Sequence, residues 1–289
     1  DGATVNTDVA GVDVSATSDY EVDALALAAS AAGLVAGVGT LTYNDLSNTT
    51  SASLRGEANI VSADGVRVRA TDPTVVEANA GGLAASLGAG VGGSFAINTL
   101  NNTVEAYSDD ASAATASGQF ELTASSFNEL DAAALAFTAG GILGGFATFS
   151  SNTVNTRTDA SVRTGGTIEA PEVVIRASDD TTMDADAGGL AASLGAGAGG
   201  SLARNIMATE VNAGIGGAEV TTTTGNVDIA AASSFDVEAD GLGFSVAGLI
   251  GGVGTATIND LANATKAYID GGAIVDSAVA VLVLAQDDS

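Results

Sequence analysis

The side chains that could do chemistry in this chain are almost all carboxylates. It carries 35 Asp and Glu against eight Lys and Arg, and it has no His, Cys or Trp. Catalysis by thiol or imidazole groups and zinc sites of the usual ligand types are therefore excluded. Carboxylates can still bind Ca²⁺, which takes roughly six to eight oxygen ligands, or act as a pair on glycosidic bonds.

Two acidic clusters are the candidate calcium ligands. One is Asp109 with Asp110, and the other is Asp184 with Asp186. Neither cluster has the full ligand spacing of an EF-hand. Carbohydrate-cleaving sites usually need aromatic platforms, and the chain has only four Tyr and eight Phe. We predict that the protein is not an enzyme and has no cofactor, with Ca²⁺ as the one candidate ion.

Three Asn-x-Thr sequons are candidate N-glycosylation sites, because this motif accepts glycans in secreted proteins. They begin at Asn48, Asn101 and Asn263. The first and third of them occupy the same position in two copies of a repeated unit. The sequence alone does not show which of the three amides faces solvent.

The net charge of −27 restricts the partners of the chain. Such a surface repels the phosphates of nucleic acids and of anionic membranes, and it favours solubility or cation binding. The few basic residues form no basic patch. We therefore predict no nucleic-acid partner.

The elements that position these residues are five copies of one unit. An apolar column recurs with a period of about 54 residues, and a fixed period of this kind is typical of a solenoid. The column is Val14, Val68, Leu122, Ile175, Ile229 and Val283. We predict a single array over residues 1–289. Its parts are a half-unit at 1–18 and repeats at 19–72, 73–126, 127–179, 180–233 and 234–289.

The units also alternate in pairs. The segment A-G-G-L-A-A-S-L-G-A-G at 80–90 returns unchanged at 187–197, whereas units one, three and five share a different version. The alternation predicts that successive units pack on one another as unlike halves. The higher-order repeat is then a pair of units.

Two polar columns recur in all five units. The acidic column is Asp23, Glu77, Asp131, Asp184 and Glu238, and the Asn column is Asn44, Asn98, Asn152, Asn205 and Asn259. If the units stack as strands, about 4.8 Å apart, the carboxylates repel one another unless Ca²⁺ or salt intervenes. The Asn side chains then form a hydrogen-bonded ladder. If helices lie between the columns, each carboxylate and each Asn instead caps its own helix, and for the carboxylates we favour this interpretation.

Between the two columns lie five runs of equal length that are almost free of charge. The runs are 24–43, 78–97, 132–151, 185–204 and 239–258, and they contain 25 of the 38 Gly but only three charged residues. A run of about 20 residues suits a helix of about 30 Å better than a single strand. We therefore favour buried helices. The alternative is a strand–turn–strand layer, because Gly88, Gly90 and Gly92 stand at strand spacing.

The remaining residues of each unit have the pattern of β-strands. Residues 50–72, for example, alternate and include an Asp-Gly turn signal before the last strand. The predicted fold class is a β-solenoid-like repeat array in which a β-layer wraps the apolar runs, and the alternative is an all-β solenoid. Because the β-patterned connections are unlike membrane loops and carry few Lys or Arg, we predict no membrane span.

The repeats resemble a known style of bacterial surface protein. Runs such as residues 80–107, alternating with V-x-V-x-A-x-S strands, are similar to the repeats of giant secreted adhesins of the filamentous-haemagglutinin and leukotoxin type. The resemblance extends over the whole chain and lies in repeat style. It implies an extended β-solenoid stalk outside the cell or on its surface, and it transfers no catalytic residue.

These observations together predict a structural extracellular protein that forms part of a surface fibre and assembles end to end with its own copies. An open strand edge is a template for another chain, and the array begins and ends with apolar strands. The predicted assembly edges are Val12 and Val14 at one end, with Val279, Val281 and Val283 at the other. Two alternatives stay open, namely a stalk segment cut from a longer adhesin and a calcium-dependent secreted module.

Overall fold

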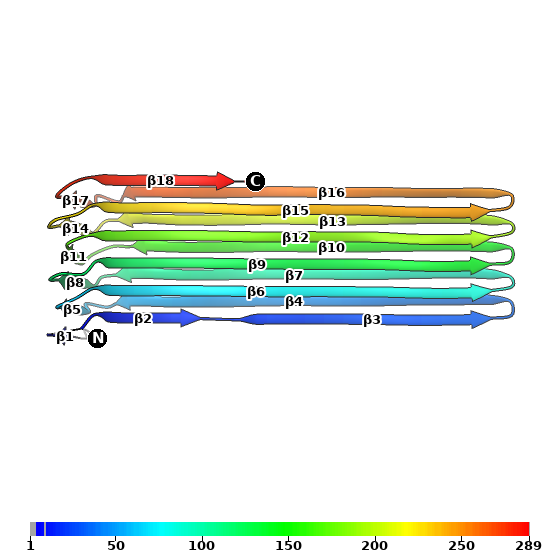
Figure 1. Cartoon of the computed structure of the whole chain (residues 1–289), viewed down its shortest axis with the longest axis horizontal. Coiled ribbons are helices and arrows are strands. Elements are labelled where there is room, and N and C mark those ends of the chain that lie inside the picture. Colours follow the sequence, from blue (N-terminus) through cyan, green and yellow to red (C-terminus); the bar gives the residue numbers. More distant parts are fainter. Residues whose placement is uncertain (1–3, 9, 289) are drawn as a thin grey trace.

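A computed structural model describes residues 4–8 and 10–288 of the chain (Figure 1). These residues form 18 β-strands that stack into parallel sheets. None of the described residues forms a helix able to cross a membrane. Residues 1–3 and 9 of the predicted half-unit, and residue 289, lie outside this description. The repeat period thus correctly predicted a β-solenoid.

Three strands make up one coil, as the second coil illustrates. The short strand β5 (Asn59–Ser62) leads into the long strand β6 (Val66–Ser86). Leu87 and Gly88 then reverse the chain, and β7 (Ala89–Asp109) returns along the opposite wall. In Figure 1 these reversals lie at one end of a flattened molecule, and the short strands lie at the other end.

Equivalent strands of successive coils form three parallel sheets. The short sheet contains β1 (Thr4–Thr7), β5, β8 (Ser112–Thr115), β11 (Thr167–Ala170), β14 (Glu219–Thr222) and β17 (Ile274–Asp276). The first wall, which we call the outgoing sheet, contains β2 (Val12–Thr17), β3 (Tyr20–Ala32), β6, β9 (Phe120–Gly140), β12 (Val173–Ser193), β15 (Val227–Ala247) and β18 (Val281–Asp288). The second wall, the returning sheet, contains β4 (Val35–Arg55), β7, β10 (Leu143–Val162), β13 (Ala196–Gly216) and β16 (Ile250–Asp270).

The favoured prediction of helices in the five apolar runs is wrong, and the all-β alternative is confirmed. Each run contains the end of one long strand, a two-residue turn and the start of the next long strand. The run therefore folds back at its middle. Its 20 residues are shared between two strands, so the argument that they are too many for one strand does not apply. Glycine is needed at the turn, because a Cβ on Gly88 would lie 2.2 Å from the carbonyl oxygen of Leu34 in the preceding coil.

The interior of the solenoid differs between the two ends of the long strands. We call the five apolar runs together the tip half of the molecule, and the remaining residues the base half. In the base half, large apolar side chains such as Phe120 and Ile175 fill the space between the walls. In the tip half, the interior contains clusters of small residues, including Ala96, Ala132 and Ala134.

Large and small side chains alternate from coil to coil inside the tip half. One inward column of the returning sheet reads Val38, Gly92, Phe146, Gly199 and Val253. Phe146 occupies the space above its glycine neighbour, since a Cβ on Gly199 would lie 1.9 Å from Cε1 of the Phe146 ring. This interdigitation accounts for the alternation of large and small residues in this inward column.

Candidate functional sites

The acidic column lies on the outer face of the outgoing sheet. Its members pair in register on adjacent strands, in the order Asp23, Glu77, Asp131, Asp184 and Glu238. Parallel strands are about 4.8 Å apart, so these like charges repel one another. The favoured interpretation, in which helices separate the carboxylates and each one caps a helix, is therefore wrong.

The repulsion is strongest near the middle of the acidic column. Burial, followed by the charges of Asp186 and Asp131, raises the pKa of Asp184 from 3.8 to about 6. Burial and the charge of Glu77 likewise raise the pKa of Asp131 above its usual value. Asp186 pairs directly with Asp240 on the next strand, and burial together with this neighbour raises its pKa as well. This part of the surface therefore takes up protons more readily than isolated carboxylates do.

The candidate calcium ligands do not come together in one site. Asp184 and Asp186 belong to the acidic region of the outgoing sheet, whereas Asp109 ends β7 on the returning sheet and Asp110 follows it. Asp109 accepts a hydrogen bond of 3.1 Å from the hydroxyl of Thr164. Within residues 4–8 and 10–288, no three carboxylates are grouped closely enough to hold a metal ion. Calcium binding stays a prediction.

The Asn column forms a continuous hydrogen-bonded ladder inside the solenoid. This confirms the ladder hypothesis for these residues and excludes the alternative in which each Asn caps a helix. Each Nδ2 donates to Oδ1 of the next Asn, and the four distances from Asn44 to Asn259 are 2.9, 3.0, 3.1 and 3.2 Å in chain order. The amides also reach the other wall, as when Asn98 Nδ2 donates to the carbonyl of Asp131 at 2.6 Å. The ladder therefore links the two walls where the base half meets the tip half.

A buried polar layer near this ladder contains carboxylates that the sequence did not place inside the solenoid. Asp72 is fully buried and accepts hydrogen bonds from Thr50 (2.7 Å) and Asn102 (3.1 Å). Asp179 lies two coils further on, and burial raises its pKa to about 6. The sequence feature that could have revealed this layer is an acidic residue at a position of the alternating strand pattern that otherwise holds inward-facing apolar residues.

This layer also decides the environment of the sequons. Asn48 Nδ2 donates to the hydroxyl of Ser18 (2.9 Å), and Asn263 makes the equivalent bond to Ser233 (2.9 Å). A glycan on either amide nitrogen would break these inward contacts, which argues against glycosylation there, and glycosylation at Asn48 and Asn263 stays a prediction. Asn101 lies at an outward position of β7 and stays a candidate.

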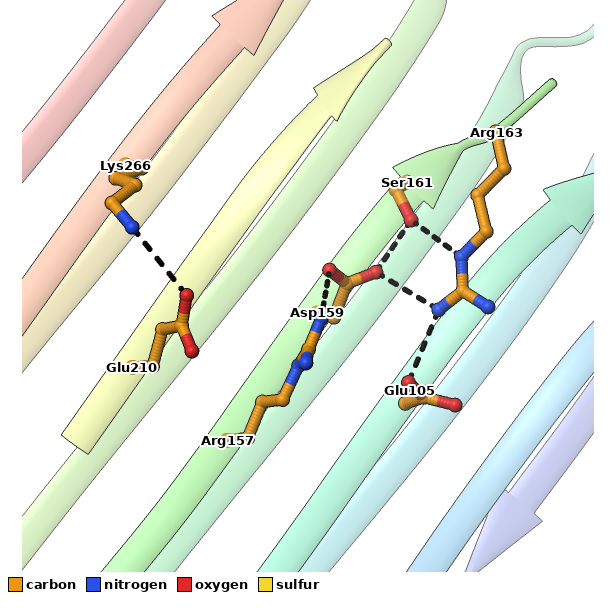
Figure 2. A network of polar contacts seen from close by, with 7 residues as sticks. All are labelled: Glu105, Arg157, Asp159, Ser161, Arg163, Glu210 and Lys266. Carbon is orange, nitrogen blue, oxygen red and sulfur yellow. Dashed lines mark hydrogen bonds and ion pairs between the residues drawn. The ribbon is translucent and has the colours of Figure 1, made fainter. Parts of the chain in front are cut away.

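A network of ion pairs covers the outer face of the returning sheet in the base half (Figure 2). The guanidinium of Arg163 lies 3.6 Å from the centroid of the Tyr107 ring. Its Nη2 is 3.1 Å from Glu105 Oε1 and 3.3 Å from Asp159 Oδ1. Asp159 also accepts a hydrogen bond from Ser161 and is only 4% exposed. Sequence reasoning missed this network, although aligning the units places Glu105 and Asp159 in one column.

A shallow polar groove lies on the same outer face. It has a volume of about 730 Å³ and is lined by residues of all five coils, including Thr49, Asn101 and Asn155. Lys266 and Glu210, whose Nζ and Oε1 are 3.5 Å apart, lie on this face too. Amide and hydroxyl groups of this kind can bind polar ligands, but they supply no activated nucleophile.

The predicted assembly edges lie at opposite ends of the stack. Among the described strands, β2 with Val12 and Val14 pairs only with β6, and β18 with Val281 and Val283 pairs only with β15. Val279 precedes β18 and is 68% exposed. Each end of the outgoing sheet therefore presents N–H and C=O groups without a neighbouring strand.

Fold and sites together define a parallel β-solenoid repeat protein whose recurrent residues build ladders, a charged column and open edges. Comparison of the chain with protein-family models, with curated proteins and with solved structures finds no match.

Proposed function

We propose that the chain is a structural, non-enzymatic protein outside the cell or on its surface, forming part of a fibre that grows end to end. The observation that carries this proposal is the unbroken register of five coils, in which equivalent strands pair in parallel from one coil to the next. Adding another coil continues every ladder without changing it. The adhesin-like repeat style supports the extracellular location, and the net charge of −27 argues against nucleic-acid partners.

A defined strand edge makes the proposal testable. Val227 donates its N–H to the carbonyl of Ala280 (2.9 Å), which places the N–H of Val281 on the open side of β18. Proline lacks this N–H and is tolerated at free edges. The double variant Val281→Pro with Val283→Pro therefore blocks pairing with another chain while leaving the contacts to β15 in place.

The experiment is electron microscopy of the purified protein at moderate salt, with sedimentation as a second measure of length. We expect fibres for the wild type, shorter particles for the Pro variant, and fibres for the matched control Val281→Thr with Val283→Thr, which keeps both N–H groups. Single-chain particles of the wild type at high concentration would overturn end-to-end assembly. That result would favour a stalk segment flanked by further repeats.

The calcium-dependent module is the second candidate, favoured by the stacked carboxylates around Asp184 and Asp186. Binding of Ca²⁺ to the folded state alone would raise the melting temperature. Melting with millimolar Ca²⁺ and with a chelator separates the two candidates. Equal melting temperatures after correction for ionic strength would remove the calcium hypothesis.

A further inference from the structure

The outer face of the outgoing sheet in the tip half is an apolar surface in contact with solvent. Leu27 is 73% exposed, Leu242 is 63% exposed and Phe244 is 62% exposed. We define this apolar face by three outward columns of β3, β6, β9, β12 and β15. They are Leu27, Gly81, Leu135, Gly188 and Leu242; Ala29, Leu83, Phe137, Leu190 and Phe244; and Ala31, Ala85, Ala139, Ala192 and Val246.

The first of these columns has a regular relief. Leucine occupies every second coil and glycine the coils between, so the ridges are about 9.6 Å apart and the gaps have the same spacing. One gap is a hollow of about 400 Å³, bounded by Leu27, Leu83, Leu135 and Phe137 over Gly81. A surface with equal ridge and gap spacing is complementary to a copy of itself displaced by one coil.

The size of the apolar face suits a weak, reversible contact. Five strands about 4.8 Å apart span about 24 Å, and five residues at about 3.3 Å span about 17 Å, which gives at most about 400 Å² per copy. Two such faces bury at most about 800 Å² in total, which is in the range of transient contacts below the roughly 1,000 Å² of a stable interface.

Charge sets the limits of the contact. None of the three columns contains a charged residue, and the nearest charges are Asp186, Asp240 and the acidic column at the border of the base half. Two copies with overlapping tips and with base halves pointing apart bury the apolar face and keep their carboxylates separate. An anionic bilayer suits this surface less well, because the neighbouring acidic column repels its headgroups.

We propose that the apolar face binds the same face of a second copy of the chain. The contact joins molecules side by side, so it goes beyond end-to-end growth and uses different residues. In a fibre it would link neighbouring rows of coils. A leucine ridge of one copy enters the hollow over Gly81 of the other.

The first test compares two phenylalanines on the same strand. Phe137 lies in the apolar face and is 46% exposed, whereas Phe127 lies on the same side of β9 in the base half and is 48% exposed. Both variants are made in the background of Val281→Pro with Val283→Pro, so that end-to-end growth does not contribute. Sedimentation in about 1 M NaCl, where the Debye length is about 3 Å, reports dimers without strong charge repulsion. We expect Phe137→Asn to weaken the dimer about tenfold or more and Phe127→Asn to leave it unchanged.

The second test fills a gap. The gap is the hollow over Gly81, where an added Cβ would lie 2.7 Å from Cδ2 of Leu27, the flexible end of a side chain that can move aside. Gly81→Leu makes the face more apolar but removes this hollow. The proposal requires weaker dimers for this variant. Tighter dimers would show non-specific hydrophobic association and overturn the proposal.

Flotation with vesicles of phosphatidylcholine tests the remaining alternative, namely that the apolar face binds a membrane. If the apolar face serves a membrane, the background variant floats with these vesicles, Phe137→Asn loses flotation and no dimer forms without lipid. That pattern overturns self-association. A background variant that dimerises although the wild type forms no fibres would support the side-by-side contact while rejecting end-to-end growth, so the two proposals can fail separately.

Discussion

The base half and the tip half have the same backbone but opposite distributions of side chains. In the base half, large apolar residues such as Phe120 lie between the walls, and the ion-pair network of Arg163 covers the outside. In the tip half, Ala and Gly lie inside, and residues such as Leu27 and Phe244 face solvent. Hydrogen-bonded ladders therefore fix the position of the tip strands, while apolar volume inside contributes much less there. The comparison shows that hydrophobicity alone does not identify the interior of a flattened solenoid.

The largest effect should come from a charge inside the tip half. Ala134 is fully buried on β9 within a cluster of alanines, where a carboxylate loses its hydration. We expect Ala134→Asp to lower the free energy of unfolding by about 4 kcal/mol or more. Chemical denaturation measures this change. Ala139→Asp, on the outward phase of the same strand, is the control with a change below about 1 kcal/mol, and similar effects of the two variants would contradict the assigned phase.

Removing the one large ring inside the tip half should be the next largest effect. Phe146→Ala leaves a cavity and should cost about 3–4 kcal/mol, whereas Phe137→Ala, on the exposed face, should cost less than about 1 kcal/mol. Gly199→Ala alone should destabilise, because its Cβ would collide with Phe146. In the Phe146→Ala background the same substitution has space and should stabilise. A thermodynamic cycle with additive effects would argue against interdigitation.

The Asn ladder at the border of the halves should show an intermediate effect. Asn152 donates to Asn205 (3.1 Å) and to the carbonyls of Leu130 (3.2 Å) and Asp184 (2.5 Å). Asn152→Ala leaves several buried groups without partners and should cost about 2–3 kcal/mol. Asn259→Ala, at the exposed end of the ladder, should cost about 1 kcal/mol or less. Equal costs at both positions, measured by urea denaturation, would mean that the ladder has no cooperative character.

The smallest expected effects concern pH and salt. Asp184 and Asp179 both have folded-state pKa values of about 6 against 3.8 when unfolded. The folded state therefore binds their protons more tightly, and this stabilisation is present below about pH 4 and lost as the pH rises through about 6. The melting temperature should gain less on acidification in Asp184→Asn or Asp179→Asn than in the wild type.

Salt should distinguish these two carboxylates. Burial is the largest cause of the raised pKa at both groups, but four neighbouring carboxylates add to it at Asp184 and only one, Asp180, at Asp179. In about 1 M NaCl the effect of Asp184→Asn should decrease, and that of Asp179→Asn should persist. Thermal melts at two pH values and two salt concentrations give the comparison. An unchanged effect of Asp184→Asn in high salt would contradict a column of interacting charges.

The sequence correctly predicted the repeat and the strand pattern of the base half, and it offered the Asn ladder as one of two alternatives. It did not predict that the acidic residues form a stacked column instead of helix caps, because that depends on whether residues 78–97 form one element or two. The length of this run, about 20 residues, favoured a single helix. The structure shows instead a turn at Leu87 and Gly88 that divides the run between two strands. The inward amide of Asn48 was equally hidden, since a sequon does not reveal which way its strand faces.

The sequence by itself determined the period, because side chains that recur at a fixed interval can stack only if each coil has that length. It also determined which columns are acidic, amide or apolar. Only the tertiary structure decided which side of each strand is inside. The tip half has Ala and Gly on one side and Leu and Phe on the other, and two walls linked by short turns can come close only through the small side chains. The large apolar residues are therefore left on the outside.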